Sequence, residues 1–406
     1  MTTDFVVPVA TASAAPEGTP CRHGEFDDIR PYRDAEVRPV LDRLIADPEL
    51  TATLLNMKFP RLWPQLHWLV RPLIRRATRR AFAGMNSVAD FQELIRIHLE
   101  RLVQRVTRGV TVSGAEKLSP GVGYLFISNH RDIAMDPALL DLVLIRRGLD
   151  TVRIAIGDNL LTKPFASDLM RLNKSFIVKR AVAGRRDKFA ALKQLSAYIR
   201  HSVRDEHCSV WIAQREGRAK DGIDRTDTAL LKMLALSRAP GQSFADAIGE
   251  LNIVPVAISY ELDPCDADKA RELHARKTAG AYHKQAHEDL ASIYKGVVGA
   301  KGGVHFAFGE LIRPAPADDD QLAAAIDHQI IANYRLQQTH IMAWEMLYVP
   351  DDRVAAWKRA LAVHDWGQDE AAFGARLAAV PAPEREILLE MYANPVSSRL
   401  AQIRSC

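Results

Sequence analysis

A histidine and an acid near the end of one apolar stretch could together remove a proton from a hydroxyl group. His130 comes just after the apolar run 124–128, and Asp136 precedes a proline and a leucine-rich segment. A carboxylate that accepts the Nδ1 proton of an imidazole leaves Nε2 available as a general base. No GxSxG nucleophile motif occurs, so we expect the hydroxyl to attack its target directly, without a covalent intermediate. The alternative is a satisfied polar pair with no catalytic role.

Basic residues follow two further apolar stretches, and they could bind an anionic substrate. Lys179 and Arg180 would place two cations at the rim of a sheet. Gly217 would let a ligand approach the backbone, and the planar guanidinium of Arg218 has the geometry that binds a phosphate. Lys179 and Arg180 could instead be a solvated strand end. A fourth apolar run, 253–259, could be plain core.

Alternating strands and helices are predicted to position these residues. The predicted strands are 110–113, 124–128, 153–156, 176–178, 209–213, 253–259 and 304–308. Helices are expected between them, for example over 137–147 and 188–204. This alternation indicates an α/β fold in which a layered mixed sheet is flanked by helices. We place this α/β domain at 110–316 and an Ala-rich helical extension at 317–406.

Positive charge is concentrated before the α/β domain. The chain carries a net charge of +4, whereas residues 58–108 contain eleven Lys or Arg and three acidic residues. Two amphipathic helices are predicted here, one kinked at Pro72 and one that begins with Asp90 and Glu93 as a capping box. Basic amphipathic helices with tryptophan suit an anionic membrane surface, although their apolar faces could simply pack on the next domain. We therefore expect a loose leader at 1–30 and a basic, membrane-facing helical region at 31–109.

The overall composition excludes several classes of protein. A chain of 406 residues with 48% hydrophobic and 26% charged residues is typical of a soluble globular protein. We find no apolar run of about 18 residues that could cross a membrane and no basic, apolar leader of a secretory signal. The four cysteines form no CxxC pair, so no metal site is predicted. These features favour a cytoplasmic location with peripheral membrane association, and the mild net charge argues against a nucleic-acid partner.

Four short blocks, in order, resemble the motifs of the glycerolipid acyltransferase superfamily over roughly residues 110–315. The blocks are Asn129-His130-Arg131 with Asp136-Pro137, then Phe176 to Arg180, then Glu216-Gly217-Arg218, and finally Val254-Pro255-Val256. The first block departs from the family motif NHxxxxD, because five residues rather than four separate His130 from Asp136. We prefer Asp136 as the partner of His130 because Pro137 aligns with the family motif. Asp132 is the alternative.

The resemblance implies transfer of a fatty acyl group from an acyl thioester to a hydroxyl of a glycerol phosphate, in phospholipid synthesis. The acyl donor would be acyl-CoA or acyl carrier protein, and no cofactor is expected. The acceptor is glycerol-3-phosphate or 1-acylglycerol-3-phosphate. The ending Ser259-Tyr260-Glu261 favours the former, and the brevity of the chain with the single Glu216-Gly217 slightly favours the latter.

The resemblance also implies a role for each site residue. His130 would be the general base and Asp136 its orienting acid. Backbone amides near the start of the helix at Pro137 are expected to stabilise the oxyanion. The residues expected to bind substrate are Asn129, Arg131, Lys179, Arg180, Glu216, Gly217 and Arg218, with the basic residues of the second and third blocks on the phosphate and Glu216 and Gly217 around the glycerol.

Two other functions stay open at this point. One is an acyltransferase for another alcohol or an amine, or an inactive lipid-binding relative whose longer His–Asp spacing has removed activity. The other is a basic binder of nucleic acid or anionic surfaces through residues 58–108, which would leave the four blocks unexplained.

Overall fold

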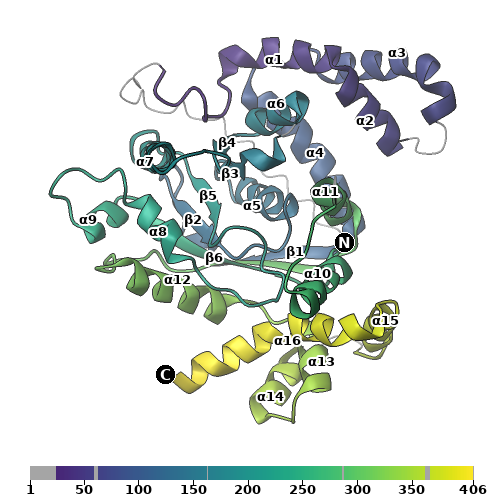
Figure 1. The fold of residues 1–406 in the computed structure, drawn as a ribbon, viewed down its shortest axis with the longest axis vertical. Helices are drawn as coiled ribbons and strands as arrows, with labels where there is room; N and C mark the ends of the chain where they lie inside the picture. Colours follow the sequence, from purple (N-terminus) through teal and green to yellow (C-terminus); the bar gives the residue numbers. More distant parts are fainter. Residues whose placement is uncertain (1–23, 59–62, 162, 286–287, 362–365, 406) are drawn as a thin grey trace, which may run out of the picture.

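A mixed seven-stranded sheet lies at the centre of the molecule (Figure 1). The computed structural model describes residues 24–58, 63–161, 163–285, 288–361 and 366–405, without the side chains of 54–58, 63–70, 366–368 and 405. The strands are β1 (Thr107–Ser113), β2 (Leu125–Ser128), β3 (Arg153–Gly157), β4 (Ser175–Val178), β5 (Val210–Ala213), β6 (Ile253–Tyr260) and β7 (Gly302–Phe308). The sheet confirms the predicted α/β class, and each strand overlaps a predicted one.

The strand order brings the four sequence blocks to one edge of the sheet. The order is β1-β7-β6-β2-β5-β3-β4, and every neighbouring pair is parallel except β6 and β7. The carboxyl ends of β2, β4, β5 and β6 therefore lie along the same edge. Each of these strands leads into, or carries, one of the four blocks, so residues far apart in the sequence meet there.

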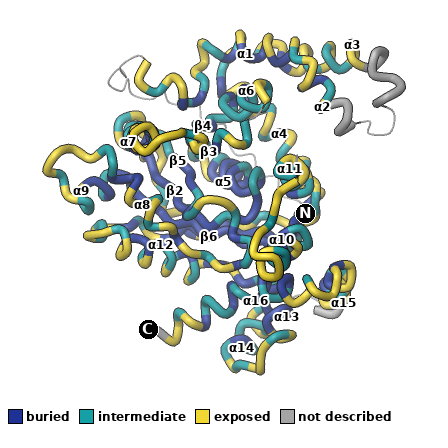
Figure 2. Tube along the Cα trace, viewed as in Figure 1, coloured by how far each residue is buried: buried dark blue, intermediate teal, exposed yellow. Residues whose placement is uncertain are grey.

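Helices cover both faces of the sheet, because alternate strand residues point to opposite sides. Leu125 and Ile127 of β2 pack in one apolar cluster with α7 (Arg185–Arg200), α8 (Thr228–Leu234), α9 (Phe244–Gly249) and α12 (Asp319–Asn333). Phe126 packs in a second cluster on the other face, against α5 (Met135–Ile145) and α4 (Val88–Val106). Figure 2 shows these central strands and α5 as the most deeply buried part of the chain.

The N-terminal helices form a layer at one end of the molecule (Figure 1). They are α1 (Asp34–Ala46), α2 (Pro48–Lys58) and α3 (Trp63–Ala81), and α1 shares a third apolar cluster with α4 and with α6 (Pro164–Leu172). The start of α4 differs from the prediction. Ser87 caps the helix by accepting from the Asp90 amide, and Asp90 is the acid of the capping box in place of Glu93. A serine hydroxyl directly before the helix is the better acceptor for its first amides.

Residues 24–30 pack on the sheet, although they were expected to belong to a loose leader. Ile29 is buried in the first apolar cluster, and its carbonyl oxygen accepts a hydrogen bond of 2.9 Å from the Ile177 amide in β4. The rest of the expected leader, 1–23, lies outside the described residues.

The C-terminal helices lie at the opposite end of the molecule (Figure 1). They are α13 (Gln338–Leu347), α14 (Asp352–Leu361), α15 (Trp366–Ala378) and α16 (Ala382–Ser405), and they confirm the predicted helical extension. Two helices between β6 and β7, α10 (Asp266–Ala279) and α11 (Glu288–Val298), connect this end to the sheet edge. Across the described residues, no helix is long and apolar enough to span a membrane.

Candidate active site

His130 and Asp136 meet at the carboxyl end of β2. The Nδ1 atom of His130 lies 2.8 Å from Oδ2 of Asp136. An ionised carboxylate only accepts hydrogen bonds, so Nδ1 carries the proton and Nε2 has a free lone pair. No described residue hydrogen-bonds to Nε2, and the His130 side chain keeps 14% of its surface exposed. The pair therefore has the geometry of a base and its orienting acid.

Asp136 is surrounded by donors, which explains how a carboxylate can be fully buried here. Its Oδ2 also accepts from the amides of Arg131 at 2.6 Å and Asp132 at 3.1 Å, and its Oδ1 accepts from the Tyr260 hydroxyl at 2.7 Å. Burial, together with the neighbouring Asp136 charge, raises the pKa of Tyr260 well above its ordinary value, so Tyr260 stays a donor. These contacts hold the carboxylate in one orientation toward His130.

Asp132, the alternative partner, has a different structural role. Its Oδ1 accepts from the amides of Ala134 at 3.0 Å and Met135 at 2.9 Å, at the start of α5. Burial, with a smaller effect of Asp136, raises the pKa of its carboxyl. Asp132 therefore caps α5, and Asp136 is the acid that contacts His130.

The predicted oxyanion amides at the start of α5 are already in use. Asp136 accepts the amides of residues 131 and 132, and Asp132 accepts those of residues 134 and 135. Pro137 has no amide hydrogen to donate. The structure therefore does not support these four amides as an oxyanion site, because the first turn of the helix satisfies its own acids.

Two residues that were predicted to bind substrate are instead committed to holding the site together. The Asn129 side chain is buried and exchanges two hydrogen bonds with the backbone of Ile258 in β6, at 2.9 and 2.7 Å. The guanidinium of Arg131 is paired with both oxygens of Asp224, at 2.8 and 2.7 Å, and lies over the ring of Tyr334. Sequence reasoning missed Asp224 because no local spacing relates residues 93 positions apart.

Strand β5 and the loop that follows it contact His130. The Trp211 ring meets the imidazole of His130 edge-on, with 5.5 Å between ring centroids, and its Nε1 donates to Ser128 Oγ at 2.9 Å. The Ala219 amide donates to the carbonyl oxygen of His130 at 2.9 Å. The third block is therefore fixed against the first, as their shared sheet edge requires.

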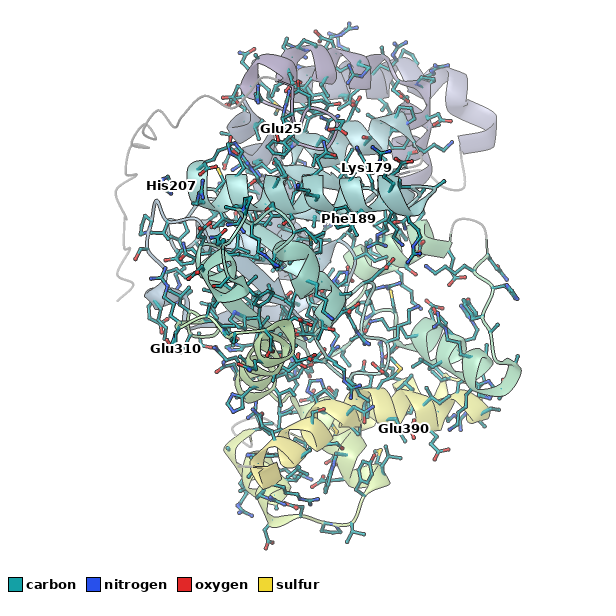
Figure 3. The ribbon with its side chains drawn as sticks, turned by 60° about the vertical axis from the view of Figure 1, so that its left-hand side comes forward. Glu25, Lys179, Phe189, His207, Glu310 and Glu390 are labelled. Carbon is teal, nitrogen blue, oxygen red and sulfur yellow. The ribbon has the colours of Figure 1, made fainter. Side chains whose placement is uncertain are left out.

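The cations of the second block are already engaged with acids near the surface. Lys179 contacts Asp28 and donates to Gln194, on the side of the molecule where Glu25 and the N-terminal helices lie (Figure 3). Arg180 forms an ion pair of 3.0 Å with Glu216, which is 74% exposed. Lys179 thus points away from the predicted phosphate site, and Arg180 and Glu216 join the second block to the third.

Arg218 is the cation of the third block that is best placed for an anionic ligand. No described acid forms an ion pair with it, and it is only partly exposed. Arg218 lies near the buried Asp263. Burial by itself would raise the pKa of Asp263, but hydrogen bonds and charges from Lys269, the Cys265 amide and, more weakly, Arg218 lower it overall. Gly217 has φ of +75°, and a Cβ at this position would meet no described atom within 4 Å. The turn before Arg218 is therefore open to a ligand.

The part of the chain that contains this site matches a known protein family. The family model named Acyltransferase matches residues 109–259. The matched residues include all four blocks, and the match confirms the predicted resemblance to the glycerolipid acyltransferase superfamily for this part of the chain. Residues 109–259 are therefore similar to acyltransferase domains.

Solved structures are similar as well, one of them over 72% of this chain. It is the 1-acyl-sn-glycerophosphate (LPA) acyltransferase PlsC from Thermotoga maritima, with 12% identity and a TM-score of 0.36, over 72% of this chain and 94% of that chain. No curated protein sequence matches the chain. Within the part of the chain that the structure describes, no three His, Cys, Asp or Glu side chains are grouped as metal ligands would be.

Proposed function

We propose that this protein transfers a fatty acyl group from an acyl thioester to a hydroxyl of a glycerol phosphate. The observation that supports this most directly is the His130–Asp136 contact of 2.8 Å inside an acyltransferase domain. Acyl transfer to a hydroxyl requires a base that removes the hydroxyl proton, and the oriented imidazole of His130 can be that base.

The proposed reaction is a single displacement. The Nε2 atom of His130 takes the proton of the acceptor hydroxyl as its oxygen attacks the thioester carbonyl carbon. The new C–O bond forms, the C–S bond breaks, and the thiolate leaves with the proton that His130 returns. Asp136 stabilises the imidazolium that exists between these two proton transfers.

The phosphate of the acceptor is proposed to bind at Arg218. Its guanidinium has no described acidic partner, lies beside an open glycine turn, and can donate two parallel hydrogen bonds to phosphate oxygens. The acceptor is proposed to be 1-acylglycerol-3-phosphate rather than glycerol-3-phosphate, and the donor to be acyl-CoA or acyl carrier protein.

A peripheral location on an anionic, cytoplasmic membrane surface is proposed for the N-terminal helices. The C-terminal half of α3 carries five arginines, and none of them forms an ion pair with a described residue. They are Arg71, Arg75, Arg76, Arg79 and Arg80. Leu73 beside them is 65% exposed. The two tryptophans of this helix lie outside the described side chains.

The test is thiol release from palmitoyl-CoA, and separately from palmitoyl acyl carrier protein, by the full chain with lipid vesicles. Lysophosphatidate, glycerol-3-phosphate or no acceptor is supplied in parallel reactions. We expect steady release with one acceptor and no burst without acceptor, because a single displacement forms no acyl-enzyme. A stoichiometric burst without acceptor would contradict the mechanism. Binding of acyl-CoA without release under any condition would favour an inactive lipid-binding relative.

A further inference from the structure

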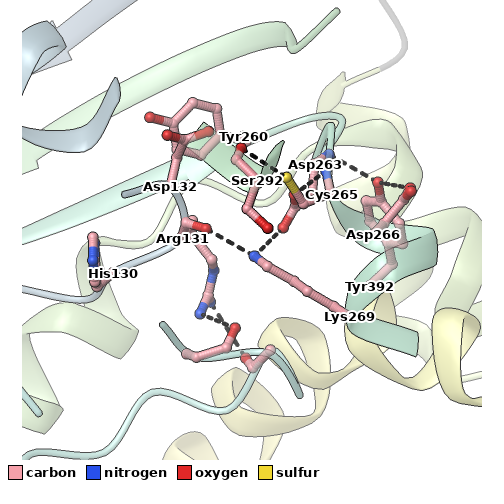
Figure 4. A network of polar contacts seen from close by, with 12 residues as sticks. His130, Arg131, Asp132, Tyr260, Asp263, Cys265, Asp266, Lys269, Ser292 and Tyr392 are labelled. Carbon is pink, nitrogen blue, oxygen red and sulfur yellow. Dashed lines mark hydrogen bonds and ion pairs between the residues drawn. The ribbon is translucent and has the colours of Figure 1, made fainter. Parts of the chain in front are cut away.

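Lys269 of α10 places a buried ammonium group beneath the loop that carries His130 (Figure 4). Its side chain is only 2% exposed. Nζ donates to the carbonyl oxygen of Arg131 at 2.8 Å and is paired with the carboxylate of Asp263. A buried charge is unfavourable unless it is paired and hydrogen-bonded, so both contacts are needed to keep the ammonium there.

The carbonyl that Lys269 holds belongs to a peptide group that also contacts Asp136. The Arg131 carbonyl and the Asp132 amide are the two ends of one planar unit. That amide donates to Asp136 Oδ2, the same oxygen that lies 2.8 Å from His130 Nδ1. Because the unit is planar, fixing its carbonyl also fixes the direction of its N–H toward the carboxylate.

The C-terminal helices hold the other end of this chain of contacts. The Tyr392 hydroxyl of α16 accepts from the Asp263 amide at 2.9 Å and donates to Asp266 at 2.8 Å. Arg376 of α15 donates to the Asp263 carbonyl at 2.6 Å and is also paired with Asp266. Figure 4 shows Tyr392, Asp266, Asp263 and Lys269 in sequence toward His130. The acid that pairs with Lys269 is thus positioned by residues outside the acyltransferase match.

Helix α16 also contacts the loop after β5, which in turn contacts Arg131 of the His130 loop. Asn394 donates to the Asp221 carbonyl at 2.7 Å. Gly222 packs so closely that a Cβ would lie 2.1 Å from the Met391 carbonyl oxygen. This turn leads to Asp224, which pairs with the Arg131 guanidinium. Both the backbone and the side chain of residue 131 are therefore supported from the C-terminal end.

We propose that Lys269 is a positioning residue for the His130–Asp136 pair and that Tyr392 acts through it. The proposal rests on the proposed function of that pair. It gives the C-terminal helices a part in setting the rate of acyl transfer. Neither Lys269 nor Tyr392 is proposed to touch the donor or the acceptor, so binding of both substrates should not depend on them.

The first test compares Lys269→Met, Tyr392→Phe and the double variant by thiol release in the full chain. We expect Lys269→Met to lower kcat by about 10- to 100-fold, since small displacements of reacting groups have effects of this size. KM for donor and acceptor should stay within about twofold of the wild-type values, because the variant removes no contact with either substrate. Tyr392→Phe should lower kcat less, and the double variant should be no slower than Lys269→Met alone.

The matched control is Lys295→Met. Lys295 also pairs with an acid of α10, Asp268, at 2.8 Å, but its side chain is 44% exposed and no described hydrogen bond or ion pair joins it to the His130 loop. We expect wild-type kcat and KM for this variant. Equal losses of kcat in Lys295→Met and Lys269→Met would overturn the proposal, because removing any ion pair of α10 would then slow the reaction.

A second measurement does not depend on acyl transfer. The Nδ1 proton of His130 should give a proton resonance at lower field than the amides, identified by its absence in His130→Ala. We expect it to weaken or shift in Lys269→Met and Tyr392→Phe. Folded variants that keep both this resonance and the wild-type kcat overturn the proposal. If the wild type releases no thiol, the proposed function fails, and the resonance alone decides the positioning role. If Lys269→Met does not fold, the test uses the kcat and the His130 resonance of Tyr392→Phe.

Discussion

At the scale of single residues, Asp136 is the acid on which the orientation of His130 depends. It accepts four hydrogen bonds and is completely buried. Asp136→Asn keeps the shape but replaces one acceptor by a donor and removes the charge that stabilises the imidazolium. We expect kcat to fall by about 10³- to 10⁴-fold, measured as thiol release at saturating substrates. A folded variant whose kcat falls by only about tenfold or less would contradict this assignment.

Asp132→Asn is the matched control for that variant. An asparagine there still presents one oxygen to the amides of Ala134 and Met135, and it removes no contact with His130. We expect kcat within about tenfold of the wild type. A larger loss than in Asp136→Asn would instead make Asp132 the orienting acid.

Arg218 and Arg180 are predicted to differ as phosphate ligands. Arg180 is already paired with the exposed Glu216, an interaction that contributes little in solvent. Arg218 has no described acidic partner. Arg218→Ala should raise KM for the phosphate acceptor by about 10- to 100-fold, as expected for loss of a charge-assisted hydrogen bond. Arg180→Ala should raise it by less than about fivefold, and the reverse order of effects would place the phosphate at the second block.

Residue types in the first block predicted the His130–Asp136 contact, but not the roles of their neighbours. Asn129 and Arg131 were expected at the substrate because they flank His130. Their partners, Ile258 and Asp224, come from distant segments, so only the three-dimensional structure shows that Asn129 and Arg131 are already engaged. Lys269 of α10 lies in no motif and was missed for the same reason.

At the scale of elements, α5 carries a buried acid whose ionisation should make stability depend on pH. Asp141 accepts from the Val152 amide at 2.8 Å, and burial raises its pKa to about 7. The folded state therefore holds a proton that the unfolded state releases above about pH 4. Stability from this group falls as pH rises from about 4 to 7, by about 4 kcal/mol in total.

The variant that isolates this effect is Asp141→Asn, which keeps an acceptor for Val152. Urea unfolding should show the variant to be more stable than the wild type at about pH 8, with a difference that shrinks toward about pH 4. A wild type that loses stability on acidification relative to the variant would show that the carboxylate is ionised in the folded state.

Helix α3 is predicted to bind anionic vesicles through its exposed arginines. Replacing Arg76, Arg79 and Arg80 by Gln removes three charges from one exposed segment. At about 1 kcal/mol for each basic residue, vesicle partitioning should fall about 100-fold. Co-sedimentation measures it, with neutral vesicles and raised salt as controls. Unchanged binding to anionic vesicles would leave these arginines without a membrane role.

The elements were largely predictable because each central strand is a short, uninterrupted apolar run. Buried parallel strands such as β2 and β5 need apolar side chains on both faces, and that pattern is visible locally. The pairing was not predictable. Strand β1 lies beside β7, whose residues are almost two hundred positions away, and no local pattern relates them.

At the scale of the whole molecule, the C-terminal helices share one apolar core with the sheet. Leu388 of α16 is fully buried in the cluster that contains Leu125 and Ile127. Leu388→Ala should lower the free energy of unfolding by about 2–5 kcal/mol, measured by urea unfolding. Leu290→Ala, at a position 52% exposed, should change it by less than about 0.5 kcal/mol. An unfolding transition of α13–α16 that is separate from that of the sheet would contradict a shared core.

The boundary placed at 316 reflects a change in composition, and it does not coincide with a gap in packing. The Ala-rich pattern correctly indicated helices, but amphipathic periodicity does not show which surface a helix covers. That information lies in long-range contacts, such as those of α16 with α13 and α10.

The central claim is that His130 is the base of an acyl transfer reaction. The most direct measurement is thiol release from the acyl donor at saturating acceptor, compared between the wild type and His130→Ala. We predict that the variant folds, still binds the donor, and releases thiol about 10³-fold more slowly or not at all. A folded His130→Ala that releases thiol within about tenfold of the wild-type rate would contradict the account.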